Sequence, residues 1–402
     1  MSLKRSLSLA AALALFAGGA HAQMSDGVIK IGVMNDQSGT YADLAGPGSV
    51  VAARMAVEDF GAAKKGMKVE IVVADHQNKP EVGSSIARQW FDVDKVDVIV
   101  DVPTSSVALA VNQIAREKNK VLIVSTGATA DLYGKACTPN TLHWTYDTWS
   151  LANGTGTAVV KNGGDTWFFL TADYAFGHSL EQQTEAVVQK LGGKVVGKVR
   201  HPFPSADMSS FLLQAQSSKA KIIGLANAGA DTINALKQGA EFGIVKGGQQ
   251  FAGLLVFLTD VHSLGLAISQ GLLLTESFYW DLNDQTRAFS KRFAQRHKGA
   301  MPTMGQAGVY SGVLHYLKAV EALKSDEGDK VVARMKELPT DDPVFGKGRV
   351  RQDGRKIHPM YLFEVKKPAE SKGAWDYYTL RGTIPAEQAF RPEKEGGCPL
   401  VK

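Results

Sequence analysis

The stretch VDVIVDVPTSSVALAVNQIAREKNKVLIVS, residues 96–125, carries the alternation that decides the fold. Residues 96–100 and 120–125 are short apolar runs rich in β-branched side chains, and they predict two strands. Between them, residues 107–117 have apolar side chains at helical spacing and predict a helix. A strand, a helix and a second strand in this order predict two parallel strands joined by a crossover helix.

The same rhythm continues on both sides of this stretch. Further strands are predicted at 28–33, 68–75, 166–170, 194–200 and 220–226, and further helices at 49–60, 80–92, 179–191, 208–217 and 231–242. Alternation of this kind predicts parallel sheets covered by helices on both faces. It occurs in two consecutive series of similar size, so we predict an α/β fold with two Rossmann-like lobes.

The pattern changes after residue 271. A strand is predicted at 272–277 and helices at 284–297 and 307–323, followed by a Gly- and Lys-rich tail of strands. A helix-rich stretch after the second lobe is best explained if the chain crosses back to complete the first. We therefore expect one lobe from 23–147 plus 279–345 and the other from 148–278 plus 346–402.

Residues 1–22, MSLKRSLSLAAALALFAGGAHA, have two basic residues, a short apolar run and small residues at 20–22. These are the parts of a secretory signal with its cleavage site, and the apolar run is too short to cross a bilayer. A buried core helix is the alternative, but two adjacent glycines would break it. We expect export to the periplasm and a mature chain that begins at Gln23.

Composition restricts the remaining classes. The formal charge is +5, which falls to +3 without the two basic residues of the signal, and this is too weak to favour nucleic acid. The two cysteines, Cys137 and Cys398, predict one disulfide in an exported chain, with two free thiols as the alternative. Nucleotide-binding, zinc and nucleophile-elbow motifs are missing, so we expect neither an enzyme nor a cofactor or metal.

Two loops at predicted strand ends are rich in hydroxyl residues: DVPTSS at 101–106 and STGATA at 125–130. Ligands of open α/β sheets bind beyond the carboxyl ends of the strands, where free N–H groups of helix N-termini attract anions. Simple helix capping would explain one such loop alone. Two on successive strands predict a carboxylate site without a fixed cation, with these candidates: Thr104, Ser105, Ser106, Gly127, Ala128 and Thr129.

Aromatic residues also gather near predicted strand ends and loops. Each alone is more commonly a core residue, but as a group they suit a pocket with flat apolar walls. With one amide, the further candidates for the ligand site are Tyr41, Tyr146, Tyr174, Phe176, Asn227 and Tyr279.

The segments 31–39 (IGVMNDQSG), 104–106, 125–129 and 173–177 (DYAFG), in this order, resemble the periplasmic solute-binding proteins of ABC importers, in the branch of the leucine/isoleucine/valine-binding protein. The resemblance implies a type I periplasmic binding fold, with two lobes joined by three hinge strands and closing around a solute. It also implies that Thr104 or Ser105 and Thr129 hold a ligand carboxylate near the backbone of 127–128. Tyr174 or Phe176 would then cover the ligand.

One departure from that family bears on the ligand. Its amino-acid binders place an acid in the second lobe opposite the ligand ammonium, whereas the corresponding stretch here, FAGLLVFL at 251–258, has none before Asp260. A buried ammonium without a counter-charge is costly. The segments 143–149 and 276–280, rich in Trp and Tyr, resemble the subgroup that takes up plant-derived aromatic acids. Asp173, Asp231 or Asp260 could still meet an ammonium.

We therefore expect a monomeric receptor that captures a small carboxylate, an aromatic acid, by hinge closure and delivers it to an ABC permease. A binding protein for branched-chain or other amino acids is the alternative within the same class. A ligand-sensing regulator built on this fold and an exported hydrolase are the alternatives from other classes.

Overall fold

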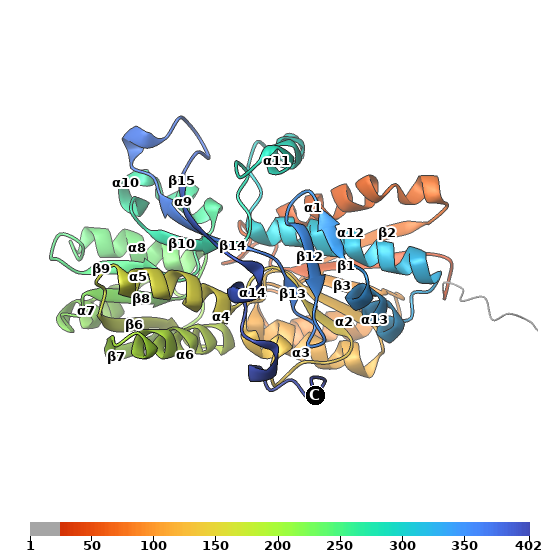
Figure 1. Cartoon of the computed structure of the whole chain (residues 1–402), viewed down its shortest axis with the longest axis horizontal. Helices are drawn as coiled ribbons and strands as arrows, with labels where there is room; N and C mark the ends of the chain where they lie inside the picture. Colours follow the sequence, from red (N-terminus) through yellow and green to blue (C-terminus); the bar gives the residue numbers. More distant parts are fainter. Residues whose placement is uncertain (1–24) are drawn as a thin grey trace, which may run out of the picture.

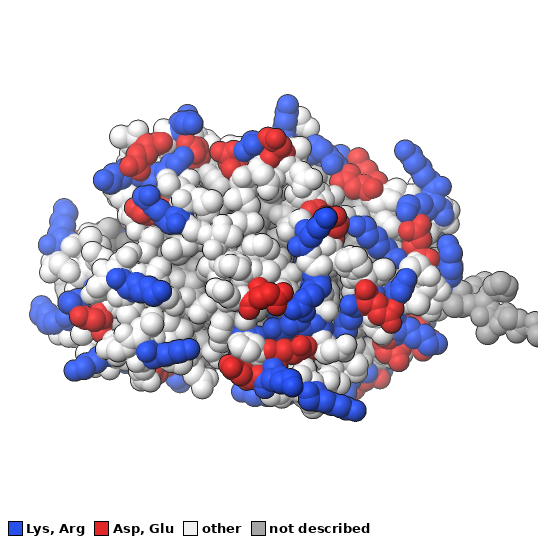
Figure 2. Space-filling model, viewed as in Figure 1, with Lys and Arg blue, Asp and Glu red and all other residues white. Residues whose placement is uncertain are grey.

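The computed structural model describes residues 25–402 and arranges them as two α/β lobes lying side by side (Figure 1). The signal predicted at 1–22 lies outside the described residues. The predicted α/β architecture with two lobes is confirmed. On the face shown in Figure 2, basic and acidic side chains are interspersed over both lobes.

A parallel five-stranded sheet in the order β2-β1-β3-β4-β5 forms the centre of the first lobe. Its strands are β1 (Ile29–Asn35), β2 (Val69–Asp75), β3 (Val98–Asp101), β4 (Val121–Val124) and β5 (Thr141–His143). The strand order reverses between β1 and β3, and at such a switch point the adjoining loops splay apart and leave a crevice.

Helices cover both faces of this sheet. They are α1 (Gly46–Phe60), α2 (Pro80–Asp92), α3 (Ser105–Glu117), α11 (Asp284–Arg296), α12 (Met304–Leu323) and α13 (Gly328–Glu337). The helix α12, which follows the second lobe in the chain, packs along α1, as the predicted crossing back requires. It begins earlier than predicted because Thr303 and Gln306 form a capping box, in which the Gln306 N–H donates to the Thr303 hydroxyl at 3.2 Å.

The second lobe has a parallel sheet in the order β7-β6-β8-β9. Its strands are β6 (Thr166–Ala172), β7 (Lys194–His201), β8 (Ile222–Ala226) and β9 (Gln250–Gly253). Its helices are α4 (Thr148–Leu151), α5 (Thr157–Lys161), α6 (Ala175–Lys190), α7 (Ser209–Ser217), α8 (Ala230–Glu241), α9 (Leu258–Leu264) and α10 (Leu266–Ser269).

The chain after α10 serves both lobes. An antiparallel sheet beside the second lobe contains β10 (Leu273–Glu276), β14 (Met360–Val365) and β15 (Tyr378–Ile384). A smaller one contains β11 (Thr340–Asp342), β12 (Gly346–Val350) and β13 (Lys356–Ile357), and a last helix, α14 (Ala386–Ala389), contacts β13. Residues 144–147, 277–283 and 358–359 lie between elements of the two lobes, and the predicted three-strand hinge stays a prediction.

The exact lobe boundaries remain a prediction. Two observations bear on the segment 346–402, which we expected in the second lobe. Arg355, just before β13, bridges to His143 of β5, and Cys398 forms a disulfide with Cys137. We therefore propose that residues 346–357 and the chain after β15 belong with the first lobe, and that only β14 and β15 belong with the second.

Candidate functional site

A small interlobe cavity of about 10 Å³ lies beyond the carboxyl ends of the parallel strands. Both lobes contribute to it, so its shape depends on how closely they approach. The first lobe and the first connection supply Tyr41, Leu44, Pro103, Thr126, Ala128 and Tyr146, and the second lobe supplies Tyr174, Phe176, Ala228, Leu255 and Phe257.

The first-lobe wall starts at a sharp turn after β3. Asp101 and Val102 both have positive φ, 85° and 52°, a conformation that is rare for residues other than glycine and strained for a β-branched one. The buried Asp101 carboxylate accepts hydrogen bonds from Asn35 Nδ2, at 2.8 Å, and from the Thr126 hydroxyl. Burial raises the pKa of Asp101, and these hydrogen bonds oppose the rise. The carboxylate thus ties the ends of three neighbouring strands together.

The loop 125–129 supplies the donors of this wall. A Cβ added at Gly127 would lie 2.6 Å from the Val102 carbonyl oxygen, so only glycine allows this approach. Within residues 25–402, the N–H groups of Gly127 and Ala128 have no hydrogen-bond partner. Unpartnered N–H groups beside a cavity can bind a carboxylate without any cation.

Tyrosines join the two walls. The Tyr41 and Tyr174 hydroxyls form a hydrogen bond across the lobes, and the ring of Phe203 stacks on Tyr174 with centroids 4.3 Å apart. Tyr146 donates its hydroxyl to the Thr126 carbonyl oxygen at 2.7 Å. Close to Tyr41, the Ala230 N–H donates to the Thr40 carbonyl oxygen at 3.2 Å. These contacts between lobes are those of a closed cleft.

The second-lobe wall is apolar, with Leu255 4% exposed and Phe257 fully buried. The buried acids of this lobe, which include Asp231, Asp260 and Glu276, do not line the cavity. Asp260 accepts the Phe257 N–H at 2.9 Å and caps α9, while Asp231 accepts the Ser205 N–H at 3.0 Å. Burial raises the pKa of Asp231 and of Asp260 to about 7, so neither is a firmly ionised partner for a ligand at neutral pH.

Five of the sequence-predicted candidates line the cavity: Tyr41, Ala128, Tyr146, Tyr174 and Phe176. Three others support the loops instead. The Thr104 hydroxyl donates to Asn78, Ser105 Oγ accepts the Thr129 N–H at 3.1 Å, and Thr129 Oγ1 accepts the Asp131 N–H at 3.4 Å.

The remaining candidates lie behind or away from the cavity wall. Gly127 backs the loop, and Ser106 lies in the first turn of α3, partly exposed. Asn227 pairs with Thr232 and His201, and the Tyr279 hydroxyl donates to the Trp375 carbonyl oxygen at 3.0 Å inside the second lobe.

Six lining residues were not among the candidates: Leu44, Pro103, Thr126, Ala228, Leu255 and Phe257. Most are apolar and resemble core residues in sequence. Within residues 25–402 there is no group of three or more metal-ligating side chains. No helix in that range is long and apolar enough to cross a bilayer.

Comparison with known proteins identifies the architecture. The profile of the periplasmic binding protein family matches residues 28–374. Leu/Ile/Val-binding protein homolog 6 of Brucella melitensis is 25% identical over 89% of this chain and 92% of its own. A periplasmic binding protein from Burkholderia mallei is 52% identical, with a TM-score of 0.91 over 94% of this chain and 100% of that one.

Two further solved structures share the fold. A branched chain amino acid ABC transporter periplasmic ligand-binding protein from Burkholderia xenovorans is 42% identical, with a TM-score of 0.82 over 93% of this chain and 100% of that one. A solute binding protein from R. palustris, in complex with benzoate, is 22% identical, with a TM-score of 0.79 over 90% and 97%.

These proteins are substrate-binding components of ABC transporters rather than enzymes, and they function outside the cytoplasm. Their class implies a small-molecule ligand and a membrane permease as partners. With its closed two-lobed fold and its interlobe cavity, the chain belongs to the periplasmic binding protein family, in the Leu/Ile/Val-binding class of ABC-transporter ligand-binding proteins.

Proposed function

We propose that this receptor binds a small aromatic carboxylate in the interlobe cavity and delivers it to its permease as a monomer. The proposal includes cleavage of the predicted signal before Gln23. The observation that carries the ligand assignment is the apolar second-lobe wall, where Leu255 and Phe257 line the cavity and no acid does. A ligand ammonium would lie there without a counter-charge, which costs several kcal/mol.

In this proposal the ligand carboxylate lies against the first lobe. The free N–H groups of Gly127 and Ala128 donate to it, and Thr104, Ser105 and Thr129 hold the two loops in place. The aromatic ring then lies between Tyr174, Phe176 and the apolar wall. Tyr41 and Tyr146 close the remaining sides of the cavity. With a polar first-lobe wall and an apolar second-lobe wall, the cavity suits a ligand that has one polar end and one apolar end.

Structural neighbours in complex with benzoate, 4-hydroxybenzoate and 3,4-dihydroxy benzoic acid support this ligand class. These neighbours are 20–22% identical to this chain. At this identity they show only that proteins of the same fold bind aromatic acids. The main support for the proposal is the composition of the cavity walls.

Mass spectrometry of the solute retained by purified protein, followed by a thermal-shift screen, tests the proposal. We expect benzoate- and cinnamate-like acids to stabilise the protein and leucine and valine to do so little. The reverse ranking would overturn the ligand assignment and leave the transport role intact.

A branched-chain amino acid is the second candidate. One observation favours it: within residues 25–402, the buried Oδ2 atom of Asp231 has no hydrogen-bond partner and lies 3.9 Å from His201 Nδ1. Asp231→Asn discriminates between the candidates. It should weaken leucine binding if Asp231 meets an ammonium and leave aromatic-acid binding unchanged if it does not.

A further inference from the structure

The C-terminal segment 385–402, called the strap below, connects the two lobes a fourth time. It follows β15, which pairs with β14 beside the second lobe. It then returns to the first lobe, where α14 contacts β13 and Cys398 forms a disulfide with Cys137, a residue 261 positions earlier in the sequence. The chain and the disulfide together therefore form a closed covalent loop that includes both lobes.

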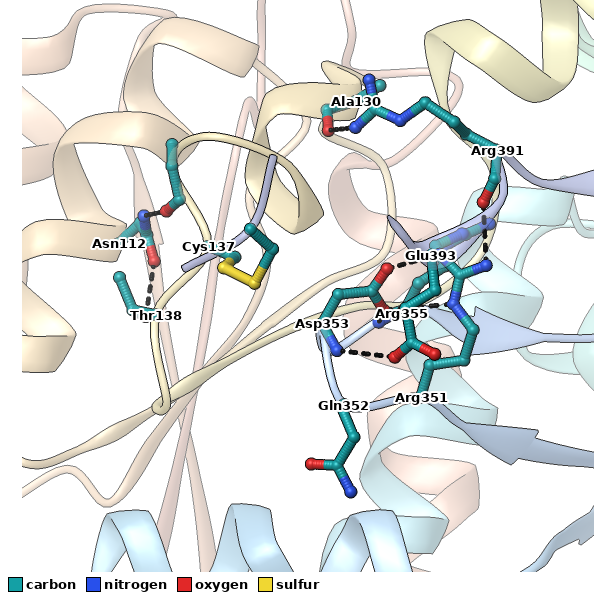
Figure 3. Close-up of a disulfide and its surroundings, with 12 residues drawn as sticks. Asn112, Ala130, Cys137, Thr138, Arg351, Gln352, Asp353, Arg355, Arg391 and Glu393 are labelled. Carbon is teal, nitrogen blue, oxygen red and sulfur yellow. Dashed lines mark hydrogen bonds and ion pairs between the residues drawn. A yellow bond between two sulfur atoms is a disulfide. The ribbon is translucent and has the colours of Figure 1, made fainter. Parts of the chain in front are cut away.

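The strap is fastened to the first lobe by buried groups as well as by the disulfide. Phe390 is 1% exposed, and the guanidinium of Arg355 lies 3.9 Å from its ring centroid. The Arg391 carbonyl oxygen accepts a hydrogen bond from Arg351 at 2.8 Å, and Glu393 accepts the Asp353 N–H at 3.3 Å. Figure 3 shows the hydrogen bonds of Arg391 with Arg351 and of Glu393 with Asp353 near the disulfide.

The same contacts reach the connections on which the lobes turn. Arg355 donates to the carbonyl oxygens of His143 and Thr145 at 2.7 and 3.0 Å and pairs with Asp147 at 3.0 Å. His358, in the third connection, packs its ring against Phe390 with centroids 5.2 Å apart. The strap therefore packs against the third connection directly and against the first through Arg355, and opening of the cleft has to move it.

The strap also contacts the candidate binding loop. Arg391 Nη2 donates to the Ala130 carbonyl oxygen at 3.2 Å, directly after the loop 125–129. From the other side, the Thr148 N–H donates to the Ala128 carbonyl oxygen at 2.8 Å, and the Thr148 hydroxyl pairs with Ser179 of the second lobe at 2.8 Å. The loop that supplies the free N–H groups is thus held by the strap and by the second lobe.

The segment between β15 and the buried Phe390 can lengthen only a little. Only residues 385–389 separate β15 from the buried Phe390, and most of them form α14. Unwinding four helical residues lengthens a chain by about 7 Å, because the rise per residue increases from about 1.5 to about 3.3 Å. Opening that demands more than this has to extract Phe390 from its buried position.

We propose that the strap, closed by Cys137–Cys398, limits how far the cleft opens and keeps the solute-free receptor near its binding-competent form. The consequence for solute binding rests on the proposed function, whereas the restricted opening does not. If fewer solute-free molecules are competent, the apparent Kd rises in the same proportion. Loss of the strap contacts is therefore expected to widen the opening and weaken solute binding.

The experiment measures the distance between fluorophores attached, through unnatural amino acids, at the exposed positions Lys64 and Lys219, without solute. The variants are C137S/C398S, R391A and, as a matched control, R381A, which removes an exposed arginine of β15 that pairs with Glu364. We expect longer and broader distances in the cysteine variant, a smaller change in R391A and no change in R381A. Unchanged distances in the first two would overturn the proposal.

A second measurement covers the case in which the cysteine variant fails to fold. The chain has two cysteines, so dithiothreitol added to folded wild-type protein acts on this disulfide alone. We expect the same increase in distance with the fold retained, and unfolding on reduction would overturn the proposal because the disulfide would then be a folding constraint. With benzoate as the probe, the apparent Kd should rise about tenfold if the competent fraction falls tenfold. Failure to bind benzoate would contradict the proposed function and leave the distance result standing.

Discussion

The first-lobe wall of the cavity is made of strand ends held by buried polar groups, whereas the second-lobe wall is made of apolar side chains. In the first, Asp101 and Gly127 fix the shape of the loop whose Ala128, with a free N–H group, lines the cavity. In the second, Leu255 and Phe257 offer neither charge nor donor, and the nearby Asp260 is occupied as a helix cap. Because the one hydroxyl among the second-lobe lining side chains, that of Tyr174, already pairs with Tyr41, a solute that bridges the lobes needs one polar end and one apolar end.

Substitution Leu255→Glu places a charge in the apolar second-lobe wall, and of the changes considered it should weaken solute binding most. The new carboxylate would lose its hydration in a wall where Leu255 is 4% exposed, and it would repel a bound acid. We expect benzoate affinity, measured by titration calorimetry, to fall by about 3 kcal/mol, or about 100-fold. Leu255→Met is the matched control and should cost less than about 1.5 kcal/mol. Unchanged benzoate affinity in Leu255→Glu would place the solute elsewhere.

Substitution Gly127→Ala should damage the polar wall. The added Cβ would lie 2.6 Å from the Val102 carbonyl oxygen, which is backbone and cannot move alone. We expect a loss of about 2 kcal/mol in unfolding free energy, measured by urea denaturation, together with weaker solute binding. Gly382→Ala is the control, because an added Cβ there meets nothing within 4 Å. Equal behaviour of the two variants would show that this loop tolerates displacement.

The pH dependence of stability reports whether Asp260, behind the apolar wall, is neutral in the folded protein. Burial raises its pKa to about 7, whereas the unfolded value is about 3.9. Between these values the folded state binds a proton that the unfolded state does not, so stability is greater at low pH and falls as pH rises through 7. From pH 6 to 8 we expect a loss of about 1.4 kcal/mol, measured by urea denaturation.

Asp260→Asn should remove this part of the slope, while Asn at the exposed Asp341 should not. A wild-type slope that Asp260→Asn leaves unchanged would mean that the carboxylate is ionised in the folded protein. The wall behind Phe257 would then carry a charge, and the contrast between the two walls would be weaker than the structure indicates.

Most of the fold was predictable from hydrophobic periodicity, because parallel strands and amphipathic helices leave strong local patterns. The helix α2 has the predicted bounds, and the predicted disulfide is confirmed. The helix α13 was missed because its apolar face, Val331, Val332 and Met335, lies in a stretch expected to form strands. The early start of α12 was signalled by Thr303-x-x-Gln306, a capping box that the apolar pattern alone does not reveal.

The cavity was less predictable than the fold. Aromatic residues at strand ends, such as Tyr41, Tyr146 and Tyr174, line it as expected. The hydroxyl candidates Thr104, Ser105 and Thr129 instead bond to other loop atoms in this structure. A sequence shows that a hydroxyl is near a strand end but not which neighbour takes its hydrogen bond. Apolar lining residues such as Leu255 carry no signal of their own, because core and cavity walls have the same composition.

The smallest expected effect is that of Tyr174→Phe, which removes the only hydroxyl that the Tyr41 hydroxyl contacts across the lobes within residues 25–402. The ring remains and can keep its stacking on Phe203. We expect a loss of about 0.5–1 kcal/mol in benzoate affinity, or two- to fivefold, because one net hydrogen bond is removed from the closed state. Unfolding free energy should hardly change, as in the control Tyr361→Phe on β14, outside the cavity.

The size of this effect distinguishes two ways of holding the carboxylate. If the N–H groups of Gly127 and Ala128 bind it, the tyrosine pair contributes only to closure, and the loss stays within fivefold. If the tyrosine hydroxyls bind it, the loss should approach that of Leu255→Glu, because a buried carboxylate left without its donors costs far more than one neutral hydrogen bond. A large loss in Tyr174→Phe with little loss in Gly127→Ala would therefore move the polar end of the site from the first-lobe loop to the tyrosines between the lobes.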